Sequence, residues 1–398
     1  MHNKMSNFSQ SVLWFGAAVS IAEIFTGALI APLGMQKGII SILIGHLIGA
    51  VIFYAAGLIG AENRLPAIKS TRISFGRYGS YLFSILNIMQ LLGWTAVMII
   101  TGAKAFDMVT GNLFNYRNER LWCVLIAMLI AIWIIVGVKN LFKINIVAVG
   151  SLFILTVILG SIVFGQSSDQ NSIAGMMTFG AAVELSVIMP LSWLPLIADY
   201  TRHLENKRLG TFYATIGYFI GSTWMYVIGL GAAIFAGNSD ITQILLAAGL
   251  GFAALAIIVL STVTTTFLDV FSAGVSFVNL NQKASEKISS LVICLLGMLL
   301  AIFISITEYE NFLYMIGSVF APLFAILITD YFVLNKKAFD ENSLFNIKNT
   351  IIWVMGVTAY RMMLSYDSPL GITLPVMLGI TLICIVTEGG IRVCSKKY

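Results

Sequence analysis

Long apolar runs recur along the whole chain and are separated by short polar segments. Most runs contain about 20 residues, the length that an α-helix needs to cross a bilayer core of about 30 Å. The pattern predicts an all-α polytopic membrane protein with twelve transmembrane helices. The expected spans are 10–34, 38–60, 79–108, 121–138, 144–166, 176–199, 210–236, 243–279, 288–307, 311–335, 350–366 and 369–391.

The composition supports this prediction. The 398 residues are 59% hydrophobic and 10% charged, whereas soluble domains contain about 25% charged residues. A large soluble helical domain is the alternative, but no segment between the runs could form a water-facing shell. The first apolar run is too long for the hydrophobic region of a signal peptide, so no cleavable leader is expected. The four cysteines and three histidines lack metal-ligand spacing.

Lys and Arg are unevenly distributed between the two sides of the predicted spans. The N-terminus and the segments after even-numbered spans hold eighteen of the 23 Lys and Arg residues, and the opposite side holds only Lys37, Arg117 and Arg120. Positively charged segments stay in the cytoplasm. We therefore expect a multi-pass protein of the plasma membrane with both termini in the cytoplasm. The net charge of +5 follows from this bias and does not indicate nucleic-acid binding.

Two spans contain residues that interrupt helices. Gly27 and Pro32 lie in the first span, and Pro190 and Pro195 flank Trp193 in the sixth. Interruptions at matching positions, five spans apart, are typical of transporters built from two inverted five-helix repeats. Unwound backbone is tolerated in a membrane where it lines a cavity or is buried in protein. The alternative is that Pro and Gly only kink these helices.

Three motifs resemble a known family. They are STRISFGRYG (70–79), ADYTRH (198–203) and GSVFAPLFAILITDYFVL (317–334). They resemble the nucleobase:cation symporter-1 family, which includes cytosine, purine, allantoin and hydantoin permeases. Within that family, the first span AAVSIAEIFTGALIAPLG looks most like the branch taken to carry hydroxymethylpyrimidine, a thiamine precursor.

The resemblance implies a leucine-transporter-like fold with broken helices one and six. The first inverted repeat is expected in residues 1–166 and the second in residues 167–335. Residues 336–398 are expected to form two accessory helices and a cytoplasmic tail.

The resemblance also implies Na⁺ as the coupling ion, held between spans one and eight. Matching WFGAAVSIAE to the family's first span places carbonyl ligands at Ala18 and Ile21. Matching LSTVTTTFLD to its eighth span places a carbonyl at Ser261 and hydroxyls at Thr264 and Thr265. These oxygens suit a hard monovalent cation and require no buried carboxylate. The alternative is that the threonine hydroxyls bond the backbone of their own helix.

The family stacks a flat heterocycle between two tryptophans, and the resemblance places these at Trp94 and Trp193. The chain departs from the hydantoin-permease pattern at Met98 and Val270, each of which stands where that pattern has an amide. Trp193 also comes about three residues later than in that pattern. These departures favour a ring other than hydantoin.

Charged residues within the predicted spans are further candidates, because such residues are costly in a membrane. They include Glu23, Lys104, Asp107, Glu184, Asp199, Asp269, Asp330 and Arg361. Glu23, Glu184 and Asp269 lie near mid-depth, and we expect them to bind substrate together with Gln90. A 4-aminopyrimidine offers an exocyclic donor and ring nitrogens to such acids. The alternative is that the acids are protonated and bond neighbouring helices.

These patterns predict a secondary active transporter that imports a pyrimidine-type compound by alternating access. Hydroxymethylpyrimidine is the expected substrate and Na⁺ the expected coupling ion. A proton-coupled cytosine or nucleobase permease is the alternative, with Glu23 or Asp269 as the proton carrier. A channel or membrane enzyme is a more distant alternative, because the sequence has no P-loop, HExxH motif or nucleophile–His pair. The expected partners are the substrate and the lipid bilayer, with no nucleic acid, and a monomer should suffice for transport.

Overall fold

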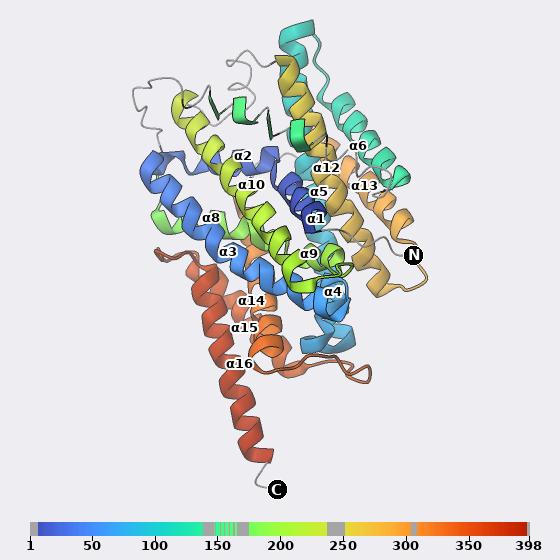
Figure 1. Cartoon of the computed structure of the whole chain (residues 1–398), viewed down its shortest axis with the longest axis vertical. Helices are drawn as coiled ribbons and strands as arrows, with labels where there is room; N and C mark the ends of the chain where they lie inside the picture. The colour runs from blue at the N-terminus through green and yellow to red at the C-terminus, as the bar shows by residue number, and fades with distance from the viewer. Residues whose placement is uncertain are drawn as a thin grey trace.

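Helices make up most of the computed structural model (Figure 1). The structure describes residues 7–137, parts of 147–164, and residues 175–236, 251–303 and 309–395. In the first half of the chain, the helices are α1 (Asn7–Ala18), α2 (Ile21–Leu29), η1 (Ala31–Leu33), α3 (Met35–Asn63), α4 (Ala67–Ser70), α5 (Arg72–Phe114) and α6 (Glu119–Val136). The later helices are α8 (Phe179–Ser192), α9 (Leu194–Thr201), α10 (Lys207–Ala236), α12 (Gly251–Leu280), α13 (Glu286–Phe303), α14 (Tyr309–Ile328), η2 (Thr329–Val333), α15 (Ile347–Met363) and α16 (Thr373–Ser395).

Apolar side chains cover the outside of the bundle as well as its interior. Leu47 and Val51 of α3 are 61% and 65% exposed, and Met89 of α5 is 62% exposed. Helices that are apolar on all sides fit a bilayer, because lipid solvates the outer face. The span formed by α8 and α9 is different, since 94% of its apolar window is buried inside the protein. This span is therefore surrounded by other helices.

Helices from the two halves of the chain interleave. Extensive contacts join α1 to α10, α3 to α8 and α5 to α12. Figure 1 shows the same arrangement, with α1 and α3 (blue) lying beside α10 (yellow-green). The interior of the bundle is consequently lined by residues that are far apart in the sequence.

Glycines of α3 allow this helix to approach α8 and α9 closely. A Cβ atom at Gly45 would meet Ser186, one at Gly49 would meet Pro190, and one at Gly60 would meet Ala198. Small residues at helix contacts are typical of membrane proteins, because backbones can then pack directly. The close approach of α3 holds the proline-containing span in place.

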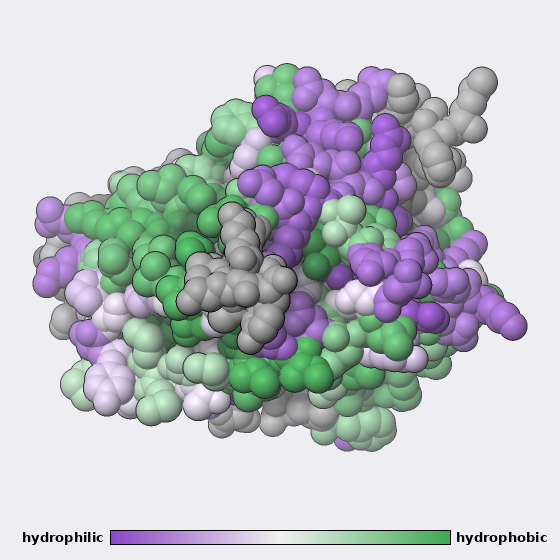
Figure 2. All heavy atoms as spheres, turned by 90° about the horizontal axis from the view of Figure 1, so that it is seen from below, coloured by the Kyte–Doolittle hydropathy of each residue, from purple (hydrophilic) through white to green (hydrophobic). Residues whose placement is uncertain are grey.

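Polar contacts fix the segments at one end of the bundle. Asp330 accepts a hydrogen bond from Asn349 Nδ2 at 2.9 Å and forms an ion pair with Lys336 at 2.9 Å. Although partial burial acts to lower it, Asp330 and Glu388 hold the pKa of Lys336 above its ordinary value. Figure 2, which views the molecule from below, shows a hydrophilic band on this face with hydrophobic residues at its left and lower margins. This pattern fits a water-exposed end of a membrane-embedded bundle.

The predicted all-α membrane fold is confirmed. In the part of the chain that the structure describes, eight helices are long and apolar enough to cross a membrane, or up to nine if α1, α2 and η1 form one bent span. Helices α15 and α16 overlap the last two predicted spans. The fifth predicted span, 144–166, lies about half outside the described residues. The count of twelve spans and the division into repeats remain predictions.

The two predicted interruptions differ in kind. The first span bends by 55° between α1 and α2. The sixth is interrupted only at Trp193, and Phe179–Thr201 still forms one span without a comparable bend. One irregular residue is enough to interrupt the helix there. Pro190 and Pro195 lie on either side of Trp193, and proline has no backbone N–H to donate.

Candidate substrate and cation site

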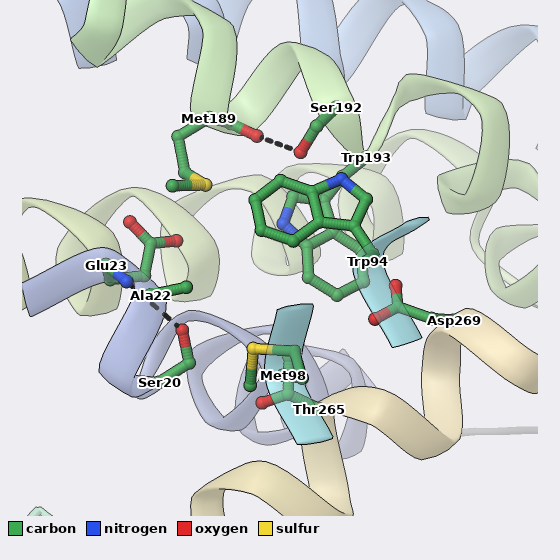
Figure 3. A pocket seen from close by; sticks show the side chains of 10 residues that line it. All are labelled: Ser20, Ala22, Glu23, Trp94, Met98, Met189, Ser192, Trp193, Thr265 and Asp269. Atoms are coloured by element: carbon green, nitrogen blue, oxygen red, sulfur yellow. Dashed lines mark hydrogen bonds between the residues drawn. The ribbon is translucent and has the colours of Figure 1, made fainter. Parts of the chain in front are cut away.

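A cavity lies where four parts of the bundle meet, and it holds about 330 Å³ of empty space including its opening. Figure 3 shows side chains from the α1–α2 break, α5, α8 and its junction with α9, and α12 converging on it. They are Ser20, Ala22, Glu23, Trp94, Met98, Met189, Ser192, Trp193, Thr265 and Asp269.

The break in the first span brings backbone and polar groups to the cavity. Helix α1 ends at Ala18 and α2 begins at Ile21. Between them Ser20 has an extended backbone, with φ −133° and ψ 158°, and its side chain accepts a hydrogen bond from Glu23 N–H at 3.3 Å. Such an N-cap fixes where a helix begins. As a result, Glu23 occupies the first turn of α2 and lines the cavity.

The junction at Trp193 exposes a backbone carbonyl to a neighbouring helix. Leu196 N–H and Ile197 N–H both donate to Trp193 O, at 3.0 and 2.9 Å. The Ser192 carbonyl thereby loses its usual donor, Leu196, and accepts from Gln90 Nε2 of α5 at 3.0 Å. Gln90 therefore ties α5 to the junction beside the cavity, although it is not among the residues that line the cavity.

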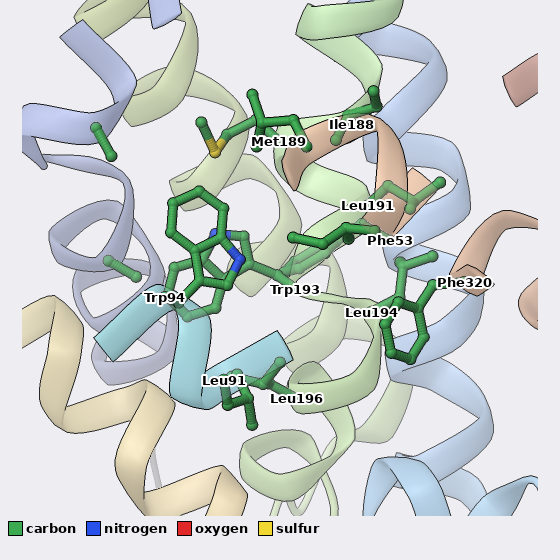
Figure 4. Close-up of a cluster of buried hydrophobic side chains, with 14 of the residues drawn as sticks. Phe53, Leu91, Trp94, Ile188, Met189, Leu191, Trp193, Leu194, Leu196 and Phe320 are labelled. Atoms are coloured by element: carbon green, nitrogen blue, oxygen red, sulfur yellow. The ribbon is translucent and has the colours of Figure 1, made fainter. Parts of the chain in front are cut away.

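Two tryptophans that are far apart in the sequence line the cavity. Trp94 is 6% exposed and Trp193 is 7% exposed. Trp94 packs edge-to-face against Phe312 at 5.4 Å between centroids, and Trp193 packs edge-to-face against Trp14 at 5.5 Å. Figure 4 shows both rings within the apolar cluster around the junction. These contacts fix the orientation of both indoles, as a stacking site for a flat ring requires.

Glu23 and Asp269 both reach the cavity, but their surroundings differ. Glu23 is 1% exposed and accepts a hydrogen bond from Tyr218 Oη at 2.7 Å, and its second carboxyl oxygen forms a hydrogen-bond contact with Ser222 Oγ, also at 2.7 Å. Asp269 is 4% exposed and, within the described part of the chain, has neither a hydrogen-bond partner nor an ion-pair partner. In Figure 3 its carboxyl group points toward the tryptophans. A buried carboxyl without a protein partner is costly, so Asp269 is the side chain most in need of a ligand.

The structure does not bring Glu184, a predicted substrate ligand, to the cavity. Glu184 lies on α8 but is not among the residues that line the cavity. Its carboxylate accepts hydrogen bonds from the hydroxyls of Tyr360 and Thr373 and from the backbone N–H groups of Ile372 and Thr373. These four bonds occupy the carboxylate in joining α8 to α15 and to the start of α16, so its role in the structure is to hold the accessory helices.

The residues predicted to bind a cation lie around the first break and the facing helix. Ala18 and Ile21 end and begin the two helices of the first span. On α12, Thr265 Oγ1 reaches across to Ala17 O at 3.4 Å, which brings α12 into contact with the break. Thr264 Oγ1 instead donates to Leu260 O of its own helix at 2.7 Å, and Ser261 is buried nearby on the same helix. A hydroxyl that donates in this way still has lone pairs for a cation.

Several residues around the cavity could not be identified from the sequence. Met189 and Ser192 line the cavity just before the junction, but in the sequence neither residue type indicates a binding site. Tyr218, Ser222 and His46 lie behind Glu23 and come from helices whose packing no local pattern predicts. Their polar groups inside apolar runs are the only signal that could have drawn attention to them.

The chain as a whole belongs to a known family of membrane permeases. Residues 2–383 match the family described as permeases for cytosine/purines, uracil, thiamine and allantoin. The match covers most of the chain, so the resemblance noted in the sequence is confirmed at the level of the family. This family membership places the chain among membrane permeases.

Curated relatives include permeases for two different kinds of ring. The cytosine permease of Escherichia coli (strain K12) is 25% identical over 329 residues, which cover 80% of this chain and 76% of the relative. The hydantoin permease of Microbacterium maritypicum is 20% identical over 385 residues, covering 88% of this chain and 77% of the relative.

Solved structures confirm the fold. The inward-facing conformation of Mhp1 has a TM-score of 0.80 at 16% identity and covers 100% of this chain and 92% of that chain. Mhp1 in a closed conformation with bromovinylhydantoin bound, titled a nucleobase-cation-symport-1 family transporter, has a TM-score of 0.79 at 18% identity, with 100% and 94% covered. A Na⁺-coupled sialic acid symporter has a TM-score of 0.68 at 14% identity, with 96% and 88% covered.

Proposed function

We propose that this permease imports a pyrimidine that carries an exocyclic amine, with hydroxymethylpyrimidine as the preferred substrate. The observation that supports this most strongly is the carboxyl group of Asp269, which has no hydrogen bond or ion pair among the described residues and shares one cavity with Trp94 and Trp193. The indoles provide stacking surfaces, and Asp269 provides an acceptor for an amine. A flat heterocycle with an amino group on its edge satisfies both.

The expected affinity is compatible with nutrient uptake. Stacking of a base on an aromatic side chain contributes about 1–3 kcal/mol, and a hydrogen bond to a charged group contributes about 1.5–3 kcal/mol. Two tryptophans and one acid would together supply most of the roughly 8 kcal/mol that a micromolar dissociation constant requires. Glu23 provides a second polar group at the cavity, although part of its hydrogen-bonding capacity is used by Tyr218 and Ser222.

We further propose that transport is symport with Na⁺. The proposed ligands are the carbonyls of Ala18, Ile21 and Ser261 and the hydroxyls of Thr264 and Thr265. The contact of Thr265 with Ala17 O at 3.4 Å supports this, because it brings hydroxyls of α12 to the unwound part of the first span. The Na⁺-coupled sialic acid symporter among the structural neighbours is consistent with it. The chain is expected to act as a monomer in the plasma membrane with both termini in the cytoplasm.

A proton-coupled cytosine permease is the second candidate. The relatedness to the cytosine permease of Escherichia coli (strain K12), at 25% identity, favours cytosine as a substrate to be tested beside hydroxymethylpyrimidine. Both compounds carry an amine next to a ring nitrogen, so both offer the same donor to Asp269.

Uptake into proteoliposomes tests the proposal. Labelled hydroxymethylpyrimidine or cytosine is offered with an inward Na⁺ gradient, and with choline replacing Na⁺ at the same pH. Unlabelled pyrimidines, purines and hydantoins then compete for uptake. We expect saturable uptake that requires Na⁺ and is inhibited by aminopyrimidines more strongly than by hydantoins. Uptake of neither compound, or strongest inhibition by hydantoins, would contradict the proposal.

A further inference from the structure

A chain of three buried polar side chains runs from the cavity into the bundle. Glu23 lies on α2, Ser222 on α10 and His46 on α3, and their exposed fractions are 1%, 0% and 1%. Ser222 Oγ lies 2.7 Å from Glu23 Oε2 and 2.6 Å from His46 Nε2. On its other side, His46 Nδ1 lies 2.9 Å from Ile42 O. We refer to Glu23, Ser222 and His46 as the Glu–Ser–His array.

The hydrogen atoms in this array can be counted from its geometry. A backbone carbonyl only accepts hydrogen bonds, so the contact with Ile42 O requires a hydrogen on His46 Nδ1. A neutral imidazole has one N–H, which leaves Nε2 as an acceptor. Ser222 has a single hydroxyl hydrogen and donates it to His46 Nε2 in that case. The contact between Ser222 and Glu23 then requires a hydrogen on Glu23 Oε2.

One other arrangement satisfies every contact. If His46 is protonated on both nitrogens, Nε2 donates to Ser222 and the hydroxyl of Ser222 donates to a Glu23 carboxylate. Both arrangements contain the same single extra proton, on Glu23 in one and on His46 in the other. Without it, Ser222 has one hydrogen for two acceptors, and two lone pairs face each other at 2.6 or 2.7 Å. A buried carboxylate would also remain, with no Lys or Arg ion pair among the described residues.

We propose that the Glu–Ser–His array is a binding site for one proton that is shared between Glu23 and His46, and that its occupancy is linked to substrate binding. The proton moves by two coupled steps that leave the number of bonds unchanged. The O–H bond of Glu23 breaks as one forms on Ser222, while the original O–H bond of Ser222 breaks as an N–H bond forms on His46 Nε2. No other reactant is needed.

The link to substrate follows from the elements that the array joins, and it rests on the function proposed above. Glu23 lines the cavity, whereas His46 lies behind it on α3. The array also connects α2, the second helix of the broken first span, to α10 and α3. Loss of the proton turns one of these connections into a repulsive contact. The position of α2, which also carries Ala22 into the cavity, therefore depends on the proton.

Other titratable groups face the array and must be considered in any pH experiment. From α10, Tyr218 donates to Glu23 and Tyr226 packs edge-to-face on the His46 ring at 4.7 Å between centroids. From α14, Tyr309 bonds Thr26 of α2 at 3.0 Å, and from α12 Asp269 shares the cavity. The tyrosines carry protons at neutral pH, so Asp269 is the group whose titration has to be separated from that of the array.

The expected pH dependence has a definite sign. The protonated array holds α2 in its position beside the cavity, so raising the pH removes the proton and weakens substrate binding. Because one proton is involved, affinity should fall by up to about tenfold for each pH unit above the titration of the array.

The first experiment measures binding of labelled cytosine and hydroxymethylpyrimidine to the purified full chain at constant Na⁺ over a range of pH. His46→Gln places an amide N–H where Nε2 lies, so Ser222 can donate to the Glu23 carboxylate without an added proton. We expect its pH profile to be flat in the range where wild-type affinity falls. His203→Gln, at the end of α9, should keep the wild-type profile. A His46→Gln profile that matches the wild type would overturn the proposal.

The second experiment needs no substrate. With three histidines in the chain, replacing His2 and His203 leaves His46 alone for ¹⁵N NMR of histidine-labelled protein. We expect Nδ1 to carry a hydrogen throughout, and the Nε2 signal to change in a single pH step. Glu23→Gln should abolish that step, and Ser222→Ala should displace it. The matched control Ser186→Ala should not, because Ser186 Oγ bonds its own helix at Ala182 O.

A His46 signal whose pH step is unaffected by both Glu23→Gln and Ser222→Ala would contradict the proton site. If neither pyrimidine binds the wild-type protein, the proposed function fails, and the NMR experiment still decides whether the array holds a proton. The two failures are therefore distinguishable.

Discussion

Replacing Asp269 with asparagine changes the interaction on which the proposed substrate class depends. Asp269→Asn conserves size but removes the charge and replaces one acceptor oxygen with a donor N–H. Asp269 is 4% exposed and has no hydrogen bond or ion pair among the described residues, so the change removes no such bond to them. The change therefore acts on whatever occupies the cavity.

The size of the expected affinity loss follows from the burial of Asp269 and from its lack of a hydrogen-bond partner among the described residues. A hydrogen bond to a charged group contributes about 1.5–3 kcal/mol, and about 1.4 kcal/mol corresponds to a tenfold change in affinity. Cytosine, which presents an amine, should lose affinity by roughly 10- to 100-fold. Uracil has a keto group in the same position and can accept from the new N–H, so its affinity should change little or improve. The ratio of the two affinities is the quantity to measure.

Competition against labelled hydroxymethylpyrimidine, in binding assays on purified protein, gives both affinities under the same conditions. Thr266→Val serves as the matched control, because its hydroxyl is buried on the same helix but bonds Thr262 O at 2.6 Å. The reasoning is refuted if Asp269→Asn weakens cytosine and uracil equally, or if Thr266→Val shifts their ratio as much. Asp269 would then stabilise α12 and not the substrate.

Further changes test other parts of the structure. Trp94→Ala should abolish saturable uptake while folded protein remains in the membrane, because a stacking surface is lost; wild-type affinity in this variant would exclude Trp94 from the site. Thr265→Ala should raise the Na⁺ concentration for half-maximal uptake, since it removes one proposed oxygen ligand. Wild-type uptake that is independent of Na⁺ would contradict this prediction. Gly229→Ala should lower the unfolding temperature of purified protein, because the new Cβ would overlap a carbonyl of α2. The control Gly379→Ala should leave that temperature unchanged, because a Cβ there meets nothing within 4 Å. A cysteine at Lys337 should react with a membrane-impermeant thiol reagent only from the cytoplasmic side; reaction from outside would contradict the predicted orientation.

Much of the fold could be predicted because it depends on local properties of the sequence. Apolar runs of sufficient length must become helices in a membrane, since each backbone group has to be satisfied within its own segment. The kind of interruption was harder to predict. The residues between Gly16 and Pro32 produce a bend of 55°, while two prolines around Trp193 produce only one irregular residue. Both spans pack closely against neighbouring helices through glycines, so the residues next to each interruption do not reveal how far the helix bends.

Part of the candidate site could be predicted from the family resemblance and from residue chemistry. The resemblance selects Trp94 and Trp193 among the seven tryptophans, Glu23 and Asp269 are acids in apolar spans, and all four line the cavity. Glu184 has the same chemistry, but Tyr360 and Thr373 occupy its carboxylate. Nothing in the residues near it in the sequence indicates those partners, which lie far along the chain.

The same limit explains why His46 and Ser222 could not be predicted. Each is an isolated polar residue in an apolar helix, where a hydrogen bond to its own backbone is the usual expectation. Their importance arises only when α2, α3 and α10 pack together and place them in line with Glu23. Interactions between distant segments therefore determine which polar residues belong to the site.

A structure of the protein with hydroxymethylpyrimidine bound tests the central claim most directly. The ring should lie between the indoles of Trp94 and Trp193, with its amine within hydrogen-bonding distance of the Asp269 carboxyl group. A ring bound elsewhere, or bound in this cavity with its amine directed away from Asp269, would contradict the account.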